Sequence, residues 1–315
     1  MTAVTKNWVP AGDTGEKLYA CTKVMSDALT EVGLLKTSDT GQINLSTVTT
    51  IAPPNTAPAD TPTEYGYEMR QLVATGKPTV YIRVSYCVVA TTANSKPTYR
   101  VAVFFRAGTG TTGSGALSGS VMEYSFNQYA SGSGLDMYTS MTAQRPLYVA
   151  SDGQHYLTVV NDPTGSANPY YKHSYMSFFC ERTVDYLSGA YDSGGLIGSN
   201  CGANSYGPCA FQLLNLTSGA VYSSLDTPYQ VPGSIFKGSG SLSTATIMPL
   251  AVVTPTPKGP AIGSVLAYSA DTTVGGQYDI AMYGVTRRYI DIGGLYAVRW
   301  PYLQAFDSRP LVRFD

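Results

Sequence analysis

The stretch that decides the fold is Pro78-Thr-Val-Tyr-Ile-Arg-Val-Ser-Tyr-Cys-Val-Val89. Every second residue in it is apolar or aromatic, with a strict period of two: Val80, Ile82, Val84, Tyr86 and Val88. Such alternation is typical of a β-strand that turns one face toward a core. A second run alternates in the same way over 99–106. The turn-rich residues 91–97 between the two runs are short enough for a hairpin.

Further along the chain, short apolar runs alternate with turn residues. The runs lie at 147–150, 156–160, 175–183, 211–216 and 221–223. A Gly/Thr/Ser-rich stretch at 107–120 reads as a loop, and no helical period separates the runs. Strands at this spacing favour an antiparallel β-sandwich built from hairpins and Greek-key returns. We therefore expect a mainly β protein with this sandwich over residues 64–253.

One convincing helix is expected near the N-terminus, over residues 13–33. Asp13 and Glu16 have the spacing of a capping box, and Gly33 stands where a helix would end. An apolar stripe recurs along the segment at Leu18, Cys21, Met25, Ala28 and Val32. Two interpretations stay open: the stripe lies on the sheet core of its own chain, or it packs against copies of itself in an oligomer.

Two proline-rich stretches divide the rest of the chain. Residues 37–63 contain Pro53-Pro54, Pro58 and Pro62, and 254–260 reads Thr-Pro-Thr-Pro-Lys-Gly-Pro. The expected organisation has four parts: an N-terminal segment with the helix at 1–36, a Pro/Thr-rich arm or linker at 37–63, the β-sandwich domain at 64–253, and a small C-terminal β-unit at 254–315. We expect the arm to lie across a neighbouring subunit.

The composition limits the possible partners. Charged residues make up only 13%, about half the usual ~25%, while Gly and Tyr reach 32 and 25 residues. The net charge is −1, so no basic surface is available to neutralise phosphates, and nucleic acid is not expected as a partner. A surface so poor in charge is weakly protected against self-association, which favours contacts with copies of the chain.

The chain shows no sign of membrane insertion or secretion. No apolar stretch approaches ~18 residues, and residues 1–10 lack the apolar region of a signal peptide. We therefore expect the protein to be made and kept in a cytoplasm until assembly. Of its five cysteines, Cys201 and Cys209 lie in a Gly/Ser/Asn-rich loop and could form a local disulfide. The others read as small buried apolar side chains.

The residues that resemble catalytic or cofactor motifs lack the necessary context. Gly108-Thr-Gly-Thr-Thr-Gly113 matches GxGxxG, but no helix follows whose N-terminus could hold a pyrophosphate. The two histidines, His155 and His173, are isolated loop residues. Glu181 alone among the glutamates lies in a strongly apolar strand, beside Arg182, which indicates an ion pair. We predict no enzyme: no catalytic, cofactor-binding or metal residue is assigned, and no cofactor is expected.

Tyrosines form the remaining distinctive feature. They cluster at Tyr65/Tyr67, Tyr124/Tyr129, Tyr170/Tyr171/Tyr175 and Tyr186/Tyr191. Such clusters can line the rim of a core, anchor a subunit interface or bind the apolar face of a sugar. All three interpretations stay open, so host surface glycan is kept as a partner.

Three segments together resemble a family of tailed-bacteriophage virion structural proteins. They are Pro78-Thr-Val-Tyr-Ile-Arg-Val-Ser-Tyr86, the strand and loop of 99–119 that ends in FFRAGTGTTGSGALSG, and Tyr175-Met-Ser-Phe-Phe-Cys-Glu-Arg-Thr-Val-Asp185. The resemblance implies a virion protein of β-sandwich type encoded among tail and adsorption components. It carries over no functional residue, and the helix and the region after Thr254 fall outside it.

The expected function is therefore that of a structural subunit of the virion, in the tail, baseplate or fibre-attachment region. It would act as a homo-oligomer through contacts with itself and with other virion proteins. The alternatives are a capsid decoration or collar protein, and a receptor-recognition module that binds glycan.

Overall fold

A computed structural model describes residues 2–9, 11–12, 14–52, 62–93, 96–125, 144–161, 176–185, 187–200, 210–225, 246–249, 258–261, 265–269, 275–282, 284–292 and 309–315. In this part of the chain the protein is mainly β, with one α-helix and three antiparallel sheets. The expected fold class, a mainly β protein with one N-terminal helix and a small C-terminal sheet, is confirmed.

The three sheets are named here by position. The outer sheet has the order β2 (Ala11–Gly12), β6 (Lys96–Thr111), β5 (Val80–Ala93), β4 (Thr63–Leu72) and β3 (Leu35–Lys36), with β7 (Leu117–Ser125) beside β6. The central sheet has the order β1 (Thr2–Trp8), β8 (Arg145–Ser151), β9 (Tyr156–Asn161), β10 (Met176–Asp185), β11 (Tyr191–Asn200), β12 (Ala210–Asn215) and β13 (Val221–Leu225), with β15 (Lys258–Pro260) beside β10. The C-terminal sheet has the order β14 (Thr246–Pro249), β16 (Val265–Ser269), β19 (Arg309–Arg313), β18 (Val285–Asp291) and β17 (Gln277–Met282).

The predicted hairpin of 78–89 and 99–106 is confirmed as β5 and β6. The two strands pair from Tyr81 opposite Gly108 to Ala93 opposite Lys96. The five alternating residues of β5 are all fully buried and join one apolar cluster. The alternation thus marks the face that the outer sheet turns toward the central sheet.

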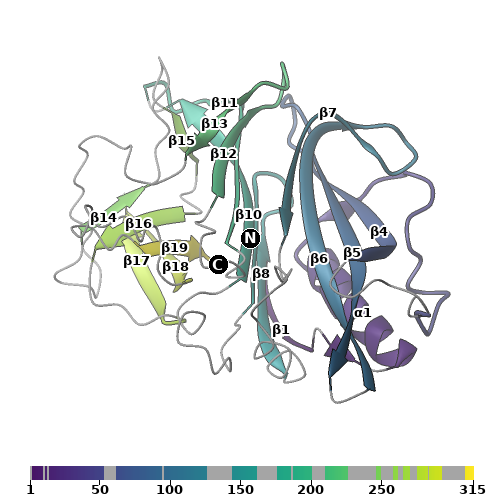
Figure 1. The fold of residues 1–315 in the computed structure, drawn as a ribbon. Helices are drawn as coiled ribbons and strands as arrows, with labels where there is room; N and C mark the ends of the chain where they lie inside the picture. The colour runs from purple at the N-terminus through teal and green to yellow at the C-terminus, as the bar shows by residue number, and fades with distance from the viewer. Residues whose placement is uncertain are drawn as a thin grey trace, which may run out of the picture.

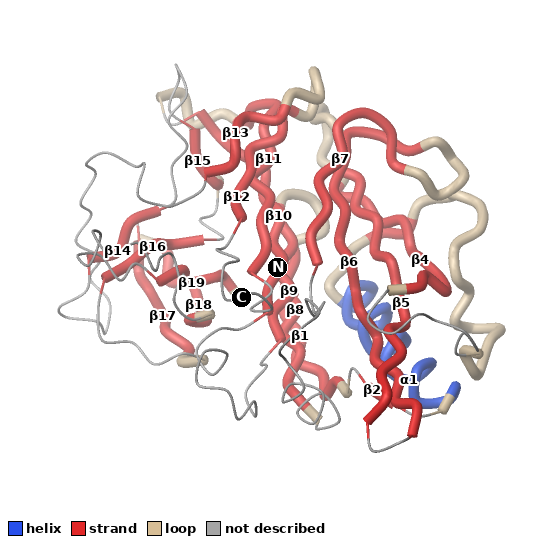
Figure 2. Tube along the Cα trace, viewed as in Figure 1, coloured by secondary structure: helices blue, strands red, loops and turns tan. Residues whose placement is uncertain are grey.

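The central sheet is covered on both faces, so the molecule has three layers (Figures 1 and 2). Neighbouring residues of β10 show this, because successive side chains of a strand point to opposite faces. Phe178 stacks on Phe105 of the outer sheet, with ring centroids 4.4 Å apart. Phe179 belongs to a separate cluster with Ile290 and Val312 of the C-terminal sheet. The sandwich of the outer and central sheets therefore carries a third layer.

The predicted helix is α1 (Gly15–Glu31), and its apolar stripe is buried in the core between the outer and central sheets. The first interpretation of the stripe is thus confirmed. The expected end is also confirmed: Gly33 has φ 80°, and the Leu34 amide donates to the Leu29 carbonyl at 3.0 Å, as in a Schellman motif.

The predicted N-cap was wrong by one residue. Thr14, not Asp13, has the extended backbone of an N-cap, and its hydroxyl accepts a hydrogen bond from the Lys17 amide. Another segment of the chain also lies close to the first residue of the helix. The Ile51 amide donates to the Gly15 carbonyl, and a Cβ at Gly15 would lie 2.6 Å from the Ile51 carbonyl oxygen.

The expected arm at 37–63 lies on its own domain wherever it is described. Its first residues follow the free edge of β4: the amides of Thr37 and Ile43 donate to the carbonyls of Met69 and Tyr67. Leu45 and Ile51 are buried. Residues 37–52 therefore cover an edge strand of their own chain, which corrects the prediction for this part. Residues 53–61 lie outside the described residues.

Strand pairing does not follow the expected domain boundaries. β1, in the segment 1–36, pairs with β8 of the central sheet over its whole length. β14 lies before residue 254 and pairs with β16 of the C-terminal sheet. β15 lies after residue 254 and pairs with β10. The proline-rich stretch at 254–260 therefore does not separate two independent sets of strands.

Candidate functional site

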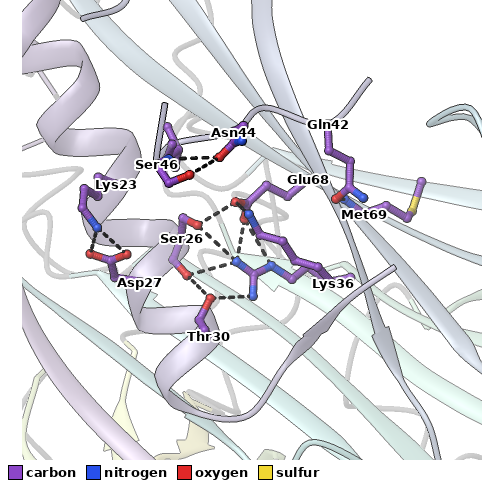
Figure 3. A network of polar contacts seen from close by, with 12 residues as sticks. Lys23, Ser26, Asp27, Thr30, Lys36, Gln42, Asn44, Ser46, Glu68 and Met69 are labelled. Carbon is purple, nitrogen blue, oxygen red and sulfur yellow. Dashed lines mark hydrogen bonds and ion pairs between the residues drawn. The ribbon is translucent and has the colours of Figure 1, made fainter. Parts of the chain in front are cut away.

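A buried ion cluster lies where α1 crosses β4 (Figure 3). Glu68 and Arg70 are two residues apart on β4 and so point to the same face, beneath the helix. Both side chains are fully buried. Nε and Nη2 of Arg70 donate to Oε2 of Glu68 at 3.1 and 2.7 Å. Nη1 of Arg70 donates to the Leu34 carbonyl at 2.8 Å, and Nη2 donates to the Ser26 carbonyl at 3.0 Å. These bonds hold the C-terminal part of α1 and the residues after it against β4.

Glu68 is surrounded by donors. The Ser26 hydroxyl donates to Oε1 at 2.6 Å, Nζ of Lys36 lies 2.5 Å from the same oxygen, and the Tyr86 hydroxyl lies 3.2 Å from Oε2. Burial alone would raise the pKa of Glu68, but Arg70, Lys36 and Ser26 outweigh it and hold the pKa below its usual value. The carboxylate is therefore ionised at neutral pH and is not a general acid.

A cavity of about 690 Å³ opens above this cluster, between α1 and the segment 44–46. Ser26 and Arg70 contribute to its lining together with the helix residues Tyr19, Lys23, Asp27 and Thr30. Its rim combines an exposed ion pair, in which Nζ of Lys23 lies 2.6 Å from Asp27, with Leu35, which is 57% exposed. The mixture of apolar and paired polar groups is that of a contact surface. The cavity is the candidate functional site.

One of the two histidines, His155, is held in the turn between β8 and β9. Nδ1 of His155 lies 3.1 Å from Oδ2 of Asp152, and its ring stacks on Tyr191 with centroids 4.5 Å apart. Oδ1 of Asp152 accepts hydrogen bonds from three backbone amides, those of Gln154, His155 and Tyr156. These bonds outweigh burial and lower the pKa of Asp152. The carboxylate thus caps the β8–β9 turn. His173 lies outside the described residues.

The glycine-rich motif, Gly108–Gly113, lies at the end of β6 and the start of the turn to β7. Gly110 pairs with Ser118 and Thr111 with Leu117, and β7 follows where a nucleotide site needs a helix. The Gly115 amide donates to Oδ1 of Asp39 at 3.2 Å, and the Thr111 hydroxyl donates to the same carboxylate. A carboxylate of the chain itself therefore occupies the loop's donors.

The described tyrosines of the predicted clusters have structural contacts. Tyr65 bonds to Thr22 and stacks on buried Tyr86 at 6.5 Å. The guanidinium of Arg83 lies 4.3 Å from the ring centroid of Tyr67, whose hydroxyl donates to the Thr40 carbonyl. The others, Tyr124, Tyr129, Tyr170, Tyr171, Tyr175 and Tyr186, have no described side chain.

Three cysteines are free and buried, as expected for apolar core residues: Cys21, Cys87 and Cys180. Burial raises the pKa of the Cys180 thiol to about 12, which makes it a poor nucleophile. The proposed disulfide of Cys201 and Cys209 lies outside the described residues. Within the described ranges, no three His, Cys, Asp or Glu side chains gather as a metal site would require.

Glu181 and Arg182 point to opposite faces of β10, since they are adjacent on the strand. Both are fully buried. Arg182 faces the outer sheet, where its donors reach three backbone carbonyls: Gln154 at 2.9 Å, Leu72 at 2.7 Å and Pro78 at 2.5 Å. It thus fastens the β4–β5 turn to the central sheet.

Sequence reasoning missed the Glu68–Arg70 cluster. The one local signal was the Glu-Met-Arg spacing of 68–70, which places both charges on one face of a strand. Its other members come from α1 and β3, and only the fold brings them together.

Comparison with protein-family models, curated proteins and solved structures found no match. Among the described residues, no helix has the length and apolar character needed to span a membrane.

Proposed function

We propose that this protein is a non-enzymatic structural subunit of a tailed-bacteriophage virion, in the tail, baseplate or fibre-attachment region. The proposal rests on the observation that the buried charged side chains hold the fold together. Arg70 and Glu68 fasten α1 to β4, and Arg182 fastens the outer sheet to the central sheet. These buried charged groups join the helix to the outer sheet and the outer sheet to the central sheet, so their role is structural.

The cavity above α1 is the proposed attachment surface. It exposes Leu35 beside Lys36 and the Lys23–Asp27 pair, and an exposed apolar residue beside paired charges suits a subunit contact. Copies of the chain and other virion proteins are the proposed partners, and the virion is the proposed location.

The phage assignment draws on the resemblance in three segments. In the fold these segments form β5, β6 with the loop to β7, and β10. They meet across the two layers of the sandwich, because Phe105 of β6 stacks on Phe178 of β10. The resemblance therefore falls on one contiguous part of the core, as a shared fold would require.

The first test measures assembly. Sedimentation of the purified chain at high concentration, alone and with other virion proteins, should show an oligomer or a complex. Leu35→Glu should weaken it, because a carboxylate would enter the contact. Leu187→Glu is the matched control, since Leu187 is 81% exposed on the β10–β11 turn. A monomer that binds none of these proteins would contradict the proposal.

The second test places the protein in the particle. Electron cryomicroscopy of the virion should find roughly three to a few dozen copies in the tail, as the cyclic symmetry of tail components implies. Hundreds of copies on the head would instead indicate a capsid decoration protein. Absence from the virion would refute both.

A further inference from the structure

The central sheet ends in a strand that has a neighbour on one side only (Figure 1). This strand, β1, pairs with β8 and with no other described strand. The pairing runs in one unbroken register from Thr2 opposite Ser151 to Trp8 opposite Arg145. In such a pair, about half of a strand's backbone N–H and C=O groups point away from its neighbour. The outer edge of β1 therefore presents backbone donors and acceptors to a further strand.

The inner face of β1 is fixed against α1. Val4 packs on the large apolar cluster, and Nζ of Lys6 is paired with Glu31 of the helix. Trp8 is fully buried, and its indole Nε1 donates to the Cys21 carbonyl at 3.0 Å. Alternate residues of a strand share a face, so the helix lies on this face of β1 and not along its edge. A strand that is held in place before a partner arrives lowers the entropy cost of binding.

The edge of β1 lacks the features that keep exposed strands apart. No proline and no β-bulge interrupts it, and its one charged residue, Lys6, is neutralised by its pair with Glu31. The residues on the other face, Ala3, Thr5 and Asn7, are exposed, short and uncharged. Prolines, bulges and unpaired charges are what prevents strand pairing at an edge. The side chains of β1 therefore leave its edge open to another strand.

The other two sheets protect edges that the structure describes. The outer sheet ends in β2 and β3, which have two residues each. The segment after β3 continues along β4, where the amides of Thr37 and Ile43 donate to its carbonyls. In the C-terminal sheet, the end strand β17 carries Asp279 in an exposed ion pair with Arg288. Short strands, covering segments and charges all discourage pairing, so the contrast indicates that β1 is kept open for a partner strand.

A second copy of the chain supplies a strand that fits this edge. The partner must itself be an exposed strand of similar length, and β1 of another copy meets that condition. Antiparallel pairing about a two-fold axis makes such a contact self-complementary.

A register centred on Thr5 suits the side chains of both copies. Thr5 then stands opposite Thr5 of the second copy, Ala3 opposite Asn7, and Val4 opposite Lys6. No like charges are directly opposite each other, and threonine pairs stabilise a sheet. The apolar stem of Lys6 can cover Val4 of the second copy.

We propose that two copies of this chain join antiparallel through β1, with Thr5 on the two-fold axis, so that their central sheets form one continuous sheet. The contact is separate from the α1 cavity, since no residue of β1 lines that cavity. It also goes beyond the proposed function, because it holds whether or not the chain belongs to a virion. A contact between two strand edges is small, so the dimer should form only at high protein concentration.

The first test measures the dimer directly. Sedimentation velocity of the full chain over a range of concentrations should show a monomer–dimer equilibrium. Thr5→Lys should weaken the dimer about tenfold or more, because it places like charges opposite each other at the axis. Thr286→Lys is the matched control: Thr286 is also an exposed threonine on a strand, β18, and its replacement should leave the dimer unchanged. Both variants should melt at the temperature of wild type, because both positions are exposed.

A cysteine scan tests the register. Oxidised Thr5→Cys should form a disulfide-linked dimer, because Cα atoms directly opposite in an antiparallel pair lie about 4.5–5.5 Å apart. Ala3→Cys alone should not, because its two copies would be roughly 13 Å apart along the strands. A mixture of Ala3→Cys and Asn7→Cys should again cross-link. Leu187→Cys measures random collision, since Leu187 is 81% exposed, and wild type measures the native cysteines.

Two results would overturn the inference: a Thr5→Cys variant that cross-links no more than Leu187→Cys, and a dimer that Thr5→Lys leaves intact. A wild type that is monomeric alone, and that loses another virion protein in Thr5→Lys, would assign the edge to that protein and exclude the second copy. Leu35→Glu alters the α1 cavity and should leave the β1 dimer intact. A β1 dimer that binds no virion protein would support the inference and contradict the proposed function alone.

Discussion

The two faces of the central sheet are built differently. The face toward the outer sheet joins one large apolar cluster, to which both sheets and α1 contribute. The face toward the C-terminal sheet has a smaller cluster around Phe179 and Ile290. Polar side chains are buried on that same face of β9 and β10: Thr158, Ser177 and Glu181.

The difference indicates how each layer is held. Apolar burial is roughly proportional to area and has no direction, so the larger cluster should dominate stability. The C-terminal sheet relies in addition on directed contacts. Arg313 lies over the Tyr156 ring at 4.9 Å, and the Tyr156 hydroxyl donates to the Asp315 carbonyl oxygen. We expect this sheet to open at a lower free energy than the other two.

The largest expected effect compares two neighbouring residues of β10. Phe178→Ala removes a ring from the large cluster and should lower the free energy of unfolding by about 3–5 kcal/mol. Its effect should spread over the outer and central sheets, because both share that cluster. Phe179→Ala should instead speed amide exchange in β17, β18 and β19 and leave β5 and β6 protected. Hydrogen–deuterium exchange with urea unfolding measures both.

Faster exchange in β5 and β6 of Phe179→Ala, as large as that in Phe178→Ala, would break the comparison. It would mean that the three layers open as one unit. Phe178→Leu and Phe179→Leu are the conservative variants. The loss of unfolding free energy in Phe178→Leu and the faster amide exchange in Phe179→Leu should both be smaller than in the alanine variants.

Buried charge on the side of the outer sheet gives the next effect. Arg70→Met leaves Glu68 buried with Lys36, Ser26 and Tyr86 as its remaining partners and should cost about 3 kcal/mol. Replacing both charges, in Glu68→Gln/Arg70→Met, should cost less than the single change, because no carboxylate is then stranded. Urea unfolding of the two variants decides. A double variant less stable than the single one would show that the pair itself stabilises the fold.

The contrast between apolar and charged core positions also explains which elements could be predicted from the sequence. β5 has one buried and one partly exposed face, so its period of two is visible, and the stripe of α1 is visible for the same reason. β4 was missed because Glu68 and Arg70 occupy positions that face the core. Only their partners on α1 and β3, which are distant in sequence, make these charges compatible with burial.

Two strands of the central sheet, β11 and β1, were not predicted from the sequence, for other reasons. β11 reads Tyr-Asp-Ser-Gly-Gly-Leu-Ile-Gly-Ser-Asn and resembles a loop. Its glycines permit close contact, since a Cβ at Gly194 would lie 2.2 Å from Oγ1 of Thr183. β1 was missed because its side chains are mostly polar and exposed, and its partner β8 lies more than a hundred residues away. Pairing so distant leaves no local pattern.

A smaller effect is expected from the arginine that joins the two large layers. Arg182→Met removes charged donors from three backbone carbonyls but strands no buried charge, so it should cost about 1–3 kcal/mol. Arg288→Met is the control in the C-terminal sheet. The ion pair of Arg288 with Asp279 is exposed, and solvent screens it. The Arg288→Met variant should therefore melt at the same temperature as wild type. Differential scanning calorimetry measures both, and a loss for Arg182→Met as large as that for Arg70→Met would remove the distinction between stranded charges and unpaired carbonyls.

The smallest effect concerns acid, and it again contrasts the central and C-terminal sheets. The pKa of Asp152 is lowered because backbone amides outweigh its burial, and that of Asp279 is lowered by its hydrogen bond to exposed Arg288. A carboxyl group whose pKa falls on folding stabilises the protein above its unfolded value, about 3.9. That stabilisation is lost as the pH drops through the folded value.

Wild type should therefore lose stability as the pH falls from about 4 toward 2, and Asp152→Asn should flatten part of that decline. Asp279→Asn should leave it unchanged, because solvent screens a fully exposed pair. Urea unfolding between roughly pH 6 and pH 2.5 compares the three proteins. Equal flattening by the two variants would mean that the β17–β18 ion pair stabilises its sheet as strongly as Asp152 stabilises the half-buried turn of β8 and β9. The C-terminal layer would then be held mainly by its charges.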